Sequence, residues 1–131
     1  MVLIADAVLN SSSSIETSDI QHVIITASLK KTELAKFDNF LKIHGAKLVA
    51  LQETHSIRLY LHISTLEALR AVRQLADSGQ LKSSVESFFN LLLNDSHCSL
   101  EEPVRVKALS LVNYCSCEQH FNSGEFMKLN Y

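Results

Sequence analysis

The sequence contains no tryptophan, one proline, three glycines and three cysteines among its 131 residues. So few glycines leave no Gly-x-Gly-x-x-Gly or Walker-type loop, which excludes most phosphate-cradling sites. The odd number of cysteines, without the spacing of a disulfide framework, indicates free thiols in a reducing compartment, so we expect a cytoplasmic protein. No apolar run approaches the roughly 18 residues that span a bilayer, and no membrane partner is expected.

Composition is that of one globular domain. The chain is 47% hydrophobic and 20% charged, which is sufficient for a sizeable core. Its formal net charge of −2 gives little electrostatic support for binding nucleic acid. The run Ser11–Ser14 indicates a linker. We therefore expect a flexible N-terminal arm over residues 1–19 and a single α/β sandwich domain over residues 20–131. Within the arm, the apolar residues 1–9 form either a short strand or helix that packs on the domain or a disordered start.

Hydrophobic periodicity predicts the order strand, helix, strand, strand, helix, strand. Strand-like alternation covers residues 23–29, 47–54, 57–63 and the segment from 104, and helical spacing covers residues 32–44 and 64–93. This order is that of the split βαβ sandwich. The predicted fold class is α+β: a ferredoxin-like sandwich with a four-stranded, mostly antiparallel sheet and helices on one face.

Individual residues mark the boundaries of these predicted elements. Gly45 supplies the left-handed residue that ends the first helix. Ser64 with Glu67 forms a capping-box pattern at the start of the second helical region, and Gly79 breaks that region into two pieces. Alternation slips within residues 106–109, which indicates a β-bulge unless this last segment is helical.

The strand at residues 57–63 carries the candidate binding residues. Arg58, Tyr60 and His62 alternate with apolar residues, so they share one face of the sheet, and His55 and Ser56 lie in the preceding turn. Arginine, tyrosine and histidine offer large areas with polar tips, as protein interfaces require. We expect these five residues to bind a partner protein, unless the face is only solvated surface.

Two kinds of reactive chemistry have candidates in the sequence. Cys98, Cys115, Cys117 and His120 are ligand types for zinc, but their spacing departs from that of known zinc motifs. Cys115 with His120 and Glu118 has the components of a catalytic cysteine site but lacks a glycine-flanked nucleophile turn. We therefore expect no enzyme, no cofactor and inert thiols.

Residues 41–93 resemble the N-terminal domain of the TNF-receptor-associated death-domain adaptors (TRADD-N-like). The likeness rests on Leu41-Lys42-Ile43-His44, the strand 57–62 and the helical region 66–93. It implies an α/β sandwich that docks a TRAF-type signalling protein through its exposed sheet face. His44 or His55 would match the docking histidine of that family.

The family's aromatic docking residues on its first strand have no counterpart, because His22, Val23 and Ile25 occupy that region. A second resemblance is to the first half of a BRCT domain. It rests on the segment 23–28, the helix ending at Gly45 and the residues that follow, and it implies a binding module with a parallel sheet. The tryptophan of that family's last helix is absent here.

We therefore expect a non-catalytic adaptor domain in intracellular, death- or immune-type signalling, either monomeric or homodimeric. Its partner would be another signalling protein. The alternatives are a BRCT-like module, a self-associating or small-molecule-regulated ferredoxin-like domain, and a sheet face that binds single-stranded RNA by stacking bases on Tyr60 and His22.

Overall fold

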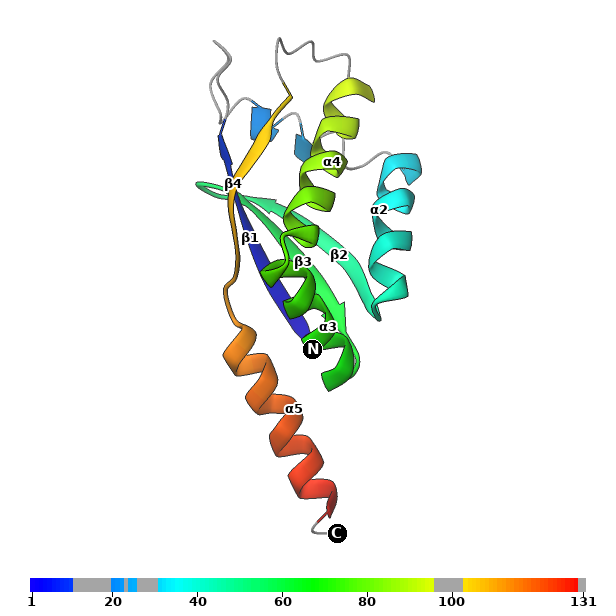
Figure 1. The fold of residues 1–131 in the computed structure, drawn as a ribbon, viewed down its shortest axis with the longest axis vertical. Helices are drawn as coiled ribbons and strands as arrows, with labels where there is room; N and C mark the ends of the chain where they lie inside the picture. The colour runs from blue at the N-terminus through cyan, green and yellow to red at the C-terminus, as the bar shows by residue number, and fades with distance from the viewer. Residues whose placement is uncertain (11–19, 23, 26–30, 96–102, 130–131) are drawn as a thin grey trace.

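The computed structural model describes residues 1–10, 20–22, 24–25, 31–95 and 103–129, and its main elements form a four-stranded sheet with helices packed on one side (Figure 1). The elements are β1 (Val2–Asn10), α2 (Lys31–Ile43), β2 (Ala46–Glu53), β3 (Ile57–Ile63), α3 (Leu66–Asp77), α4 (Gln80–Asp95), β4 (Arg105–Leu111) and α5 (Tyr114–Leu129). Helix α5 projects beyond the end of the sheet (Figure 1).

The strands lie in the order β2-β3-β1-β4, and each neighbouring pair is antiparallel. The first strand of the chain, β1, is therefore a central strand. The prediction of a flexible arm is wrong over residues 2–10, because these residues pair with both β3 and β4. The rest of the predicted arm, residues 11–19, lies outside the described residues.

Alternate residues of β1 and β3 point toward the helices and form the centre of the core. Leu3, Ala5, Ala7 and Leu9 of β1 and Ile57, Leu59, Leu61 and Ile63 of β3 are all buried. Side chains of successive strand residues point to opposite faces, so the intervening residues lie on the other side of the sheet. The small alanines of β1 leave room for the large side chains of the helices above them.

The strand predicted over residues 23–29 is wrong where the structure describes it. Ile24 and Ile25 are helical, as are residues 20–22, whereas Val23 and residues 26–29 lie outside the described residues. Ile20 and Ile24 are both fully buried. Their spacing of four residues places them on one side of a helical turn, and this burial prevails over the β preference of the β-branched run.

The helix boundaries follow local chemistry. Thr65, not Ser64, caps α3, because the Thr65 hydroxyl accepts a hydrogen bond from the Ala68 amide at 3.1 Å. Gly45 and Gly79 have positive φ angles of 80° and 84° and separate the elements as predicted. Helix α2 begins at Lys31, one residue before the start predicted from helical spacing.

Strand β4 contains the predicted bulge. Its pairing with β1 shifts between Val8 and Leu9, so Lys107 is the extra residue opposite that step. The predicted helical alternative for this segment is therefore wrong. None of the described helices is long and apolar enough to cross a membrane.

Candidate functional site

The predicted binding residues lie on the outer face, which we define as the side of the sheet opposite α2, α3 and α4 (Figure 1). Strand pairing places each outer-face residue beside its neighbours. The outer face comprises Val2, Ile4, Asp6 and Val8 of β1, Lys47, Ala50 and Gln52 of β2, Arg58, Tyr60 and His62 of β3, and Arg105, Ala108 and Ser110 of β4.

Tyr60 lies at the centre of this face. It is half-buried and is paired with Ala50 on one side and Ile4 on the other. Its hydroxyl donates a hydrogen bond to Gln52 Oε1. The ring is therefore partly exposed beside the small Ala50, and its polar tip is satisfied by Gln52.

Arg58 and Asp6 form an ion pair across β3 and β1. The Asp6 Oδ1 and Arg58 Nε atoms are 3.5 Å apart, and both side chains are partly exposed. The Ser56 hydroxyl donates to the same carboxylate oxygen. Ser56 is itself buried, so it offers little contact area, and its hydrogen bond holds Asp6 in place.

His55 and His62 remain accessible. His55 is exposed in the turn before β3, and His62 is exposed at the far end of the strand, between Val2 and Lys47. His44, the other candidate docking histidine, lies beyond the end of α2, with its ring edge-on to Phe40 at 5.5 Å between centroids. Of the two, only His55 adjoins the outer face.

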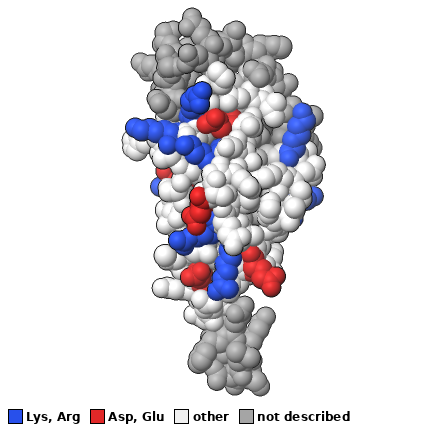
Figure 2. All heavy atoms as spheres, viewed as in Figure 1, with Lys and Arg blue, Asp and Glu red and all other residues white. Residues whose placement is uncertain are grey.

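The outer face is cationic although the whole chain is acidic. It carries Lys47, Arg58 and Arg105 against the single carboxylate of Asp6, whereas the chain has a net charge of −2. On the helix side, acidic and basic residues are interspersed (Figure 2). The described outer-face residues therefore carry a formal charge of +2, from three cations and one carboxylate.

One backbone amide on each edge strand of the sheet donates to a carboxylate from a helix. At the β2 edge the Leu48 amide donates to Asp38 Oδ1 at 3.1 Å, and at the β4 edge the Val106 amide donates to Glu86 Oε2 at 2.8 Å. An unpaired edge amide would otherwise attract another strand. At these two positions the edge amides are therefore not available to an added strand.

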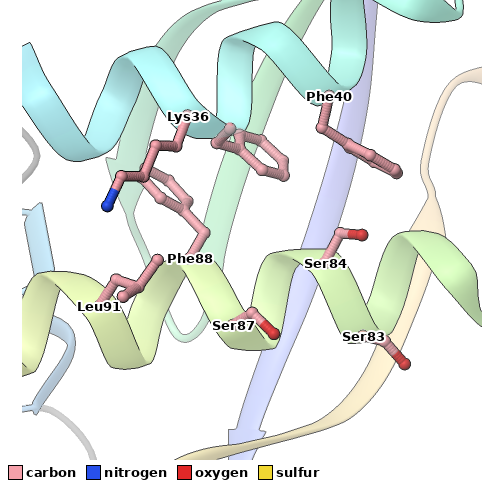
Figure 3. Close-up of a pocket in the computed structure, with 8 residues that line it drawn as sticks. Lys36, Phe40, Ser83, Ser84, Ser87, Phe88 and Leu91 are labelled. Carbon is pink, nitrogen blue, oxygen red and sulfur yellow. The ribbon is translucent and has the colours of Figure 1, made fainter.

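A groove of about 290 Å³ lies on the helix side, between α2 and α4 (Figure 3). Phe37 and Phe88 are stacked beneath it with ring centroids 4.7 Å apart and nearly parallel planes. The lining residues are Lys36, Phe37 and Phe40 of α2 and Ser83, Ser84, Ser87, Phe88 and Leu91 of α4. The sequence did not indicate this groove, because its two walls are more than 40 residues apart in the chain.

A second, more polar hollow of about 380 Å³ lies where α3, β4 and α5 meet. Its wall includes Tyr114, whose ring lies under the Arg73 guanidinium at 4.6 Å. Burial, together with the neighbouring Glu118 carboxylate, raises the pKa of Tyr114 above its ordinary value. The Tyr114 hydroxyl donates to Glu118 Oε2 at 3.2 Å, so this carboxylate serves Tyr114 and not a cysteine.

The described candidate metal ligands do not form a cluster. Cys115 and Cys117 lie on α5, where the first is exposed and the second buried. His120, also on α5, is exposed and its ring lies edge-on to Phe121. Cys98 lies outside the described residues. Within the described ranges, no three His, Cys, Asp or Glu side chains are close enough to hold a metal ion together.

Cys117 has a structural position. Its thiol lies 3.5 Å from the carbonyl oxygen of Val2 and belongs to the hydrophobic core. Burial raises the pKa of this thiol above its ordinary value of 9.0. A reactive cysteine needs the opposite shift, toward the thiolate.

No family of known proteins matches this sequence, and no curated protein or solved structure is similar to it.

Proposed function

We propose that the chain is a non-catalytic protein-interaction module of the adaptor type that binds a partner protein through its outer face. The observation that carries this proposal is the composition of that face. On this face the ring of Tyr60 lies beside Ile4, and Arg58 lies beside Asp6. The exposed Val2 and Val8 share the face and lie beside His62 and Ala108. Apolar and aromatic residues combined with arginine are typical of the centres of protein interfaces.

The size of the outer face indicates a small interface. Four strands spaced about 4.8 Å apart, with seven residues rising about 3.3 Å each, span roughly 19 Å by 23 Å. The projected area is roughly 440 Å², at the lower end of what specific complexes bury per partner. We therefore expect a transient complex rather than an obligate one.

We further propose that the fold is the ferredoxin-like split βαβ sandwich. The succession β1, α2, β2, β3, α3 with α4, and β4 supports this, as does the strand order β2-β3-β1-β4. In that arrangement one side of the sheet is covered by helices and the other is available for binding.

The charge of the outer face favours an acidic partner surface over a second copy of the chain. In a two-fold pairing of outer faces, Lys47, Arg58 and Arg105 would meet the same cations of the other copy, with only Asp6 to offset them. Like charges across an interface are unfavourable. A TRAF-type signalling protein remains the partner that the TRADD-N-like resemblance implies.

The experiment is affinity capture from cytosolic extract at low and high salt, with wild type and two variants. Tyr60→Ala removes the central ring, and Lys47→Glu/Arg105→Glu reverses two exposed cations at separate strands. The matched control is Lys42→Glu/Arg70→Glu, which makes the same charge change on exposed residues of the helices. The proposal predicts a partner whose capture is weakened by salt and lost in both outer-face variants but retained by the control.

Three other outcomes would contradict the proposed role of the outer face. A large fall in the melting temperature of Tyr60→Ala without any loss of binding would show that the ring is structural. Light scattering that detects a dimer, abolished by Tyr60→Ala, would replace the partner with a second copy. Binding of a single-stranded oligonucleotide that depends on Tyr60 would replace it with nucleic acid.

A further inference from the structure

The hollow where α3, β4 and α5 meet lies along an open edge of the sheet. β4 is an edge strand, and among the described residues it pairs only with β1. The hollow is lined by the consecutive residues 109–113, whose side chains alternate between the two faces of the sheet. Contact with both sets of side chains places the hollow beside the backbone of β4. Helix α3 forms the other wall through Arg73, Ala76 and Asp77.

The backbone groups of Leu109 and Leu111 point toward this hollow. The Val112 amide donates to the Ile4 carbonyl of β1 at 2.9 Å. Along a strand, the N–H and C=O groups of successive residues point to opposite edges, so those of Leu111 and Leu109 point away from β1. None of the residues that the structure describes bonds to these outward groups. They are therefore available to a further strand.

The open part of this edge is short. At the start of β4 the Val106 amide is occupied by Glu86, and the bulge at Lys107 interrupts the ladder. Residues 109–112 rise about 3.3 Å each, so the open part is about 13 Å long and fits an extended segment of roughly five residues. A second copy of the chain would bring its own α3 and α5 beside its β4, because these helices flank the same edge in every copy. A separate extended segment brings no such helices.

The walls of the hollow favour an alternating side-chain pattern. Leu109 and Leu111 are half-buried on the helix side of the sheet, and so is Ala76 of α3. Ser110, between the two leucines, is exposed on the outer face. Residues opposite each other in a ladder have their side chains on the same face. A segment paired here would place apolar side chains toward α3 and a polar one beside Ser110.

The charged groups on the walls already have partners in the fold. Arg73 Nε lies 3.6 Å from Asp77 Oδ2, and the Arg73 guanidinium lies over the Tyr114 ring. The Tyr114 hydroxyl donates to Glu118 Oε2. Backbone pairing and apolar contact, rather than charge, would therefore select what binds.

We propose that the hollow binds an extended segment of a partner protein, which adds a fifth, antiparallel strand beside Leu109 and Leu111. The segment exchanges backbone hydrogen bonds with the outward groups of these two residues and places alternate apolar side chains toward α3. The antiparallel direction follows that of every strand pair described in this sheet. This site uses the edge of the sheet and does not rest on the function proposed for the outer face.

The test is amide hydrogen exchange of the full chain, followed by NMR, with the probe peptide acetyl-Glu-Val-Thr-Val-Glu-amide. Its two valines are the residues expected opposite Leu109 and Leu111. The expected result is saturable binding that slows exchange of the Leu109 and Leu111 amides at least five-fold. No saturable binding, or protection centred on any other segment, would overturn the proposal. Protection that rises with protein concentration in the absence of peptide would assign the edge to a second copy instead.

Two N-methylated peptides form a matched pair. In an antiparallel ladder, the valine N–H groups face β4 and the threonine N–H faces away from it. Methylation of both valine nitrogens should therefore weaken binding at least ten-fold, whereas methylation of the threonine nitrogen should leave it within three-fold. Equal binding of the two methylated peptides, or the reverse order, would overturn the proposal without requiring any variant of the protein.

A pair of variants tests the helix wall. Ala76→Glu places a carboxylate against the inward valines and should weaken peptide binding at least five-fold. Gln74→Glu makes a substitution to the same residue at an exposed position of α3 outside the hollow, and it should leave binding within two-fold. Unchanged binding in a folded Ala76→Glu variant would contradict the predicted contact between the segment and α3.

Discussion

The side-chain amide of Asn90 pairs with the backbone of Val104 as a neighbouring strand would. Asn90 Oδ1 accepts from the Val104 amide at 2.9 Å, and Asn90 Nδ2 donates to the Val104 carbonyl at 3.0 Å. The same Nδ2 also donates to the Glu86 carbonyl within α4. The Asn90 side chain of α4 thus satisfies both backbone hydrogen-bonding groups of Val104, the buried residue that precedes β4.

Asn90→Ala should lower the free energy of unfolding by about 1–3 kcal/mol, because it leaves a buried backbone donor and acceptor without partners. Asn90→Asp keeps one acceptor but places a carboxylate oxygen opposite the Val104 carbonyl. We expect that variant to be destabilised at neutral pH and partly restored in mild acid, when the carboxyl is protonated. Urea unfolding at two pH values measures both effects, with the exposed Gln80→Ala as the control on the same helix.

Gly45 and Gly79, which both have positive φ angles, should differ in how well they tolerate substitution by alanine. A methyl group on Gly45 would lie 2.8 Å from Ala68 Cβ, whereas one on Gly79 would meet nothing within 4 Å. Gly79→Ala should cost about 1 kcal/mol, from the left-handed backbone alone. Gly45→Ala should cost more, and Ala68→Gly should recover part of that extra cost. Additive effects of Gly45→Ala and Ala68→Gly in a double-mutant cycle would contradict the predicted contact.

The two described cysteines should react with thiol reagents at different rates. Cys115 is exposed at the start of α5, whereas Cys117 is buried and has a raised pKa. In a Cys98→Ser background, we expect one fast and one slow thiol in a titration with a chromogenic disulfide. The slow phase should become fast in denaturant. Two fast thiols under native conditions would show that the start of α5 opens readily.

Alkaline pH should destabilise the fold through Cys117 and Tyr114. Burial raises the pKa of the thiol above 9.0, and burial with the Glu118 carboxylate raises that of the phenol above 10.0. The folded state therefore holds these protons more tightly than the unfolded state does. The contribution of Cys117 and Tyr114 to the free energy of unfolding is fully present below the ordinary pKa of each group. It is lost as the pH rises through the raised pKa of each group in the folded state.

The measurement is the free energy of unfolding as a function of pH above neutrality. Its slope should become less steep above pH 9 in Cys117→Ser and above pH 10 in Tyr114→Phe, whatever the stability of each variant at pH 7. Slopes equal to that of wild type in both variants would assign the alkaline loss to other groups.

The sequence predicted the second half of the fold well and misplaced its beginning. Residues 57–63 alternate between apolar and polar side chains because only one side of β3 is covered, and this contrast is readable. In β1 the inward Leu3 and Leu9 and the outward Val2 and Val8 are all apolar, so no contrast marks the strand. A central strand beside a serine run therefore resembles a disordered start.

The candidate binding residues also show which features local periodicity can and cannot predict. Alternation alone placed Arg58, Tyr60 and His62 on one side of the sheet. The burial of Ser56 depends on Asp6, a partner 50 residues away, and no local pattern indicates it. The groove depends on α2 and α4 packing at a particular separation. Such contacts between distant segments are determined by tertiary packing, which the periodicity of one segment does not contain.

The carboxylates of Asp38 and Glu86 at the two sheet edges also affect how the proposed partner specificity could evolve. The edge amides of Leu48 and Val106 are occupied, so the proposed recognition through the outer face relies on side chains and not on backbone pairing at these positions. The outer-face side chains alternate with the core residues and do not themselves fill the core. Under the proposed function, substitutions there would alter the choice of partner while the folded scaffold is retained, so specificity and folding would diverge independently.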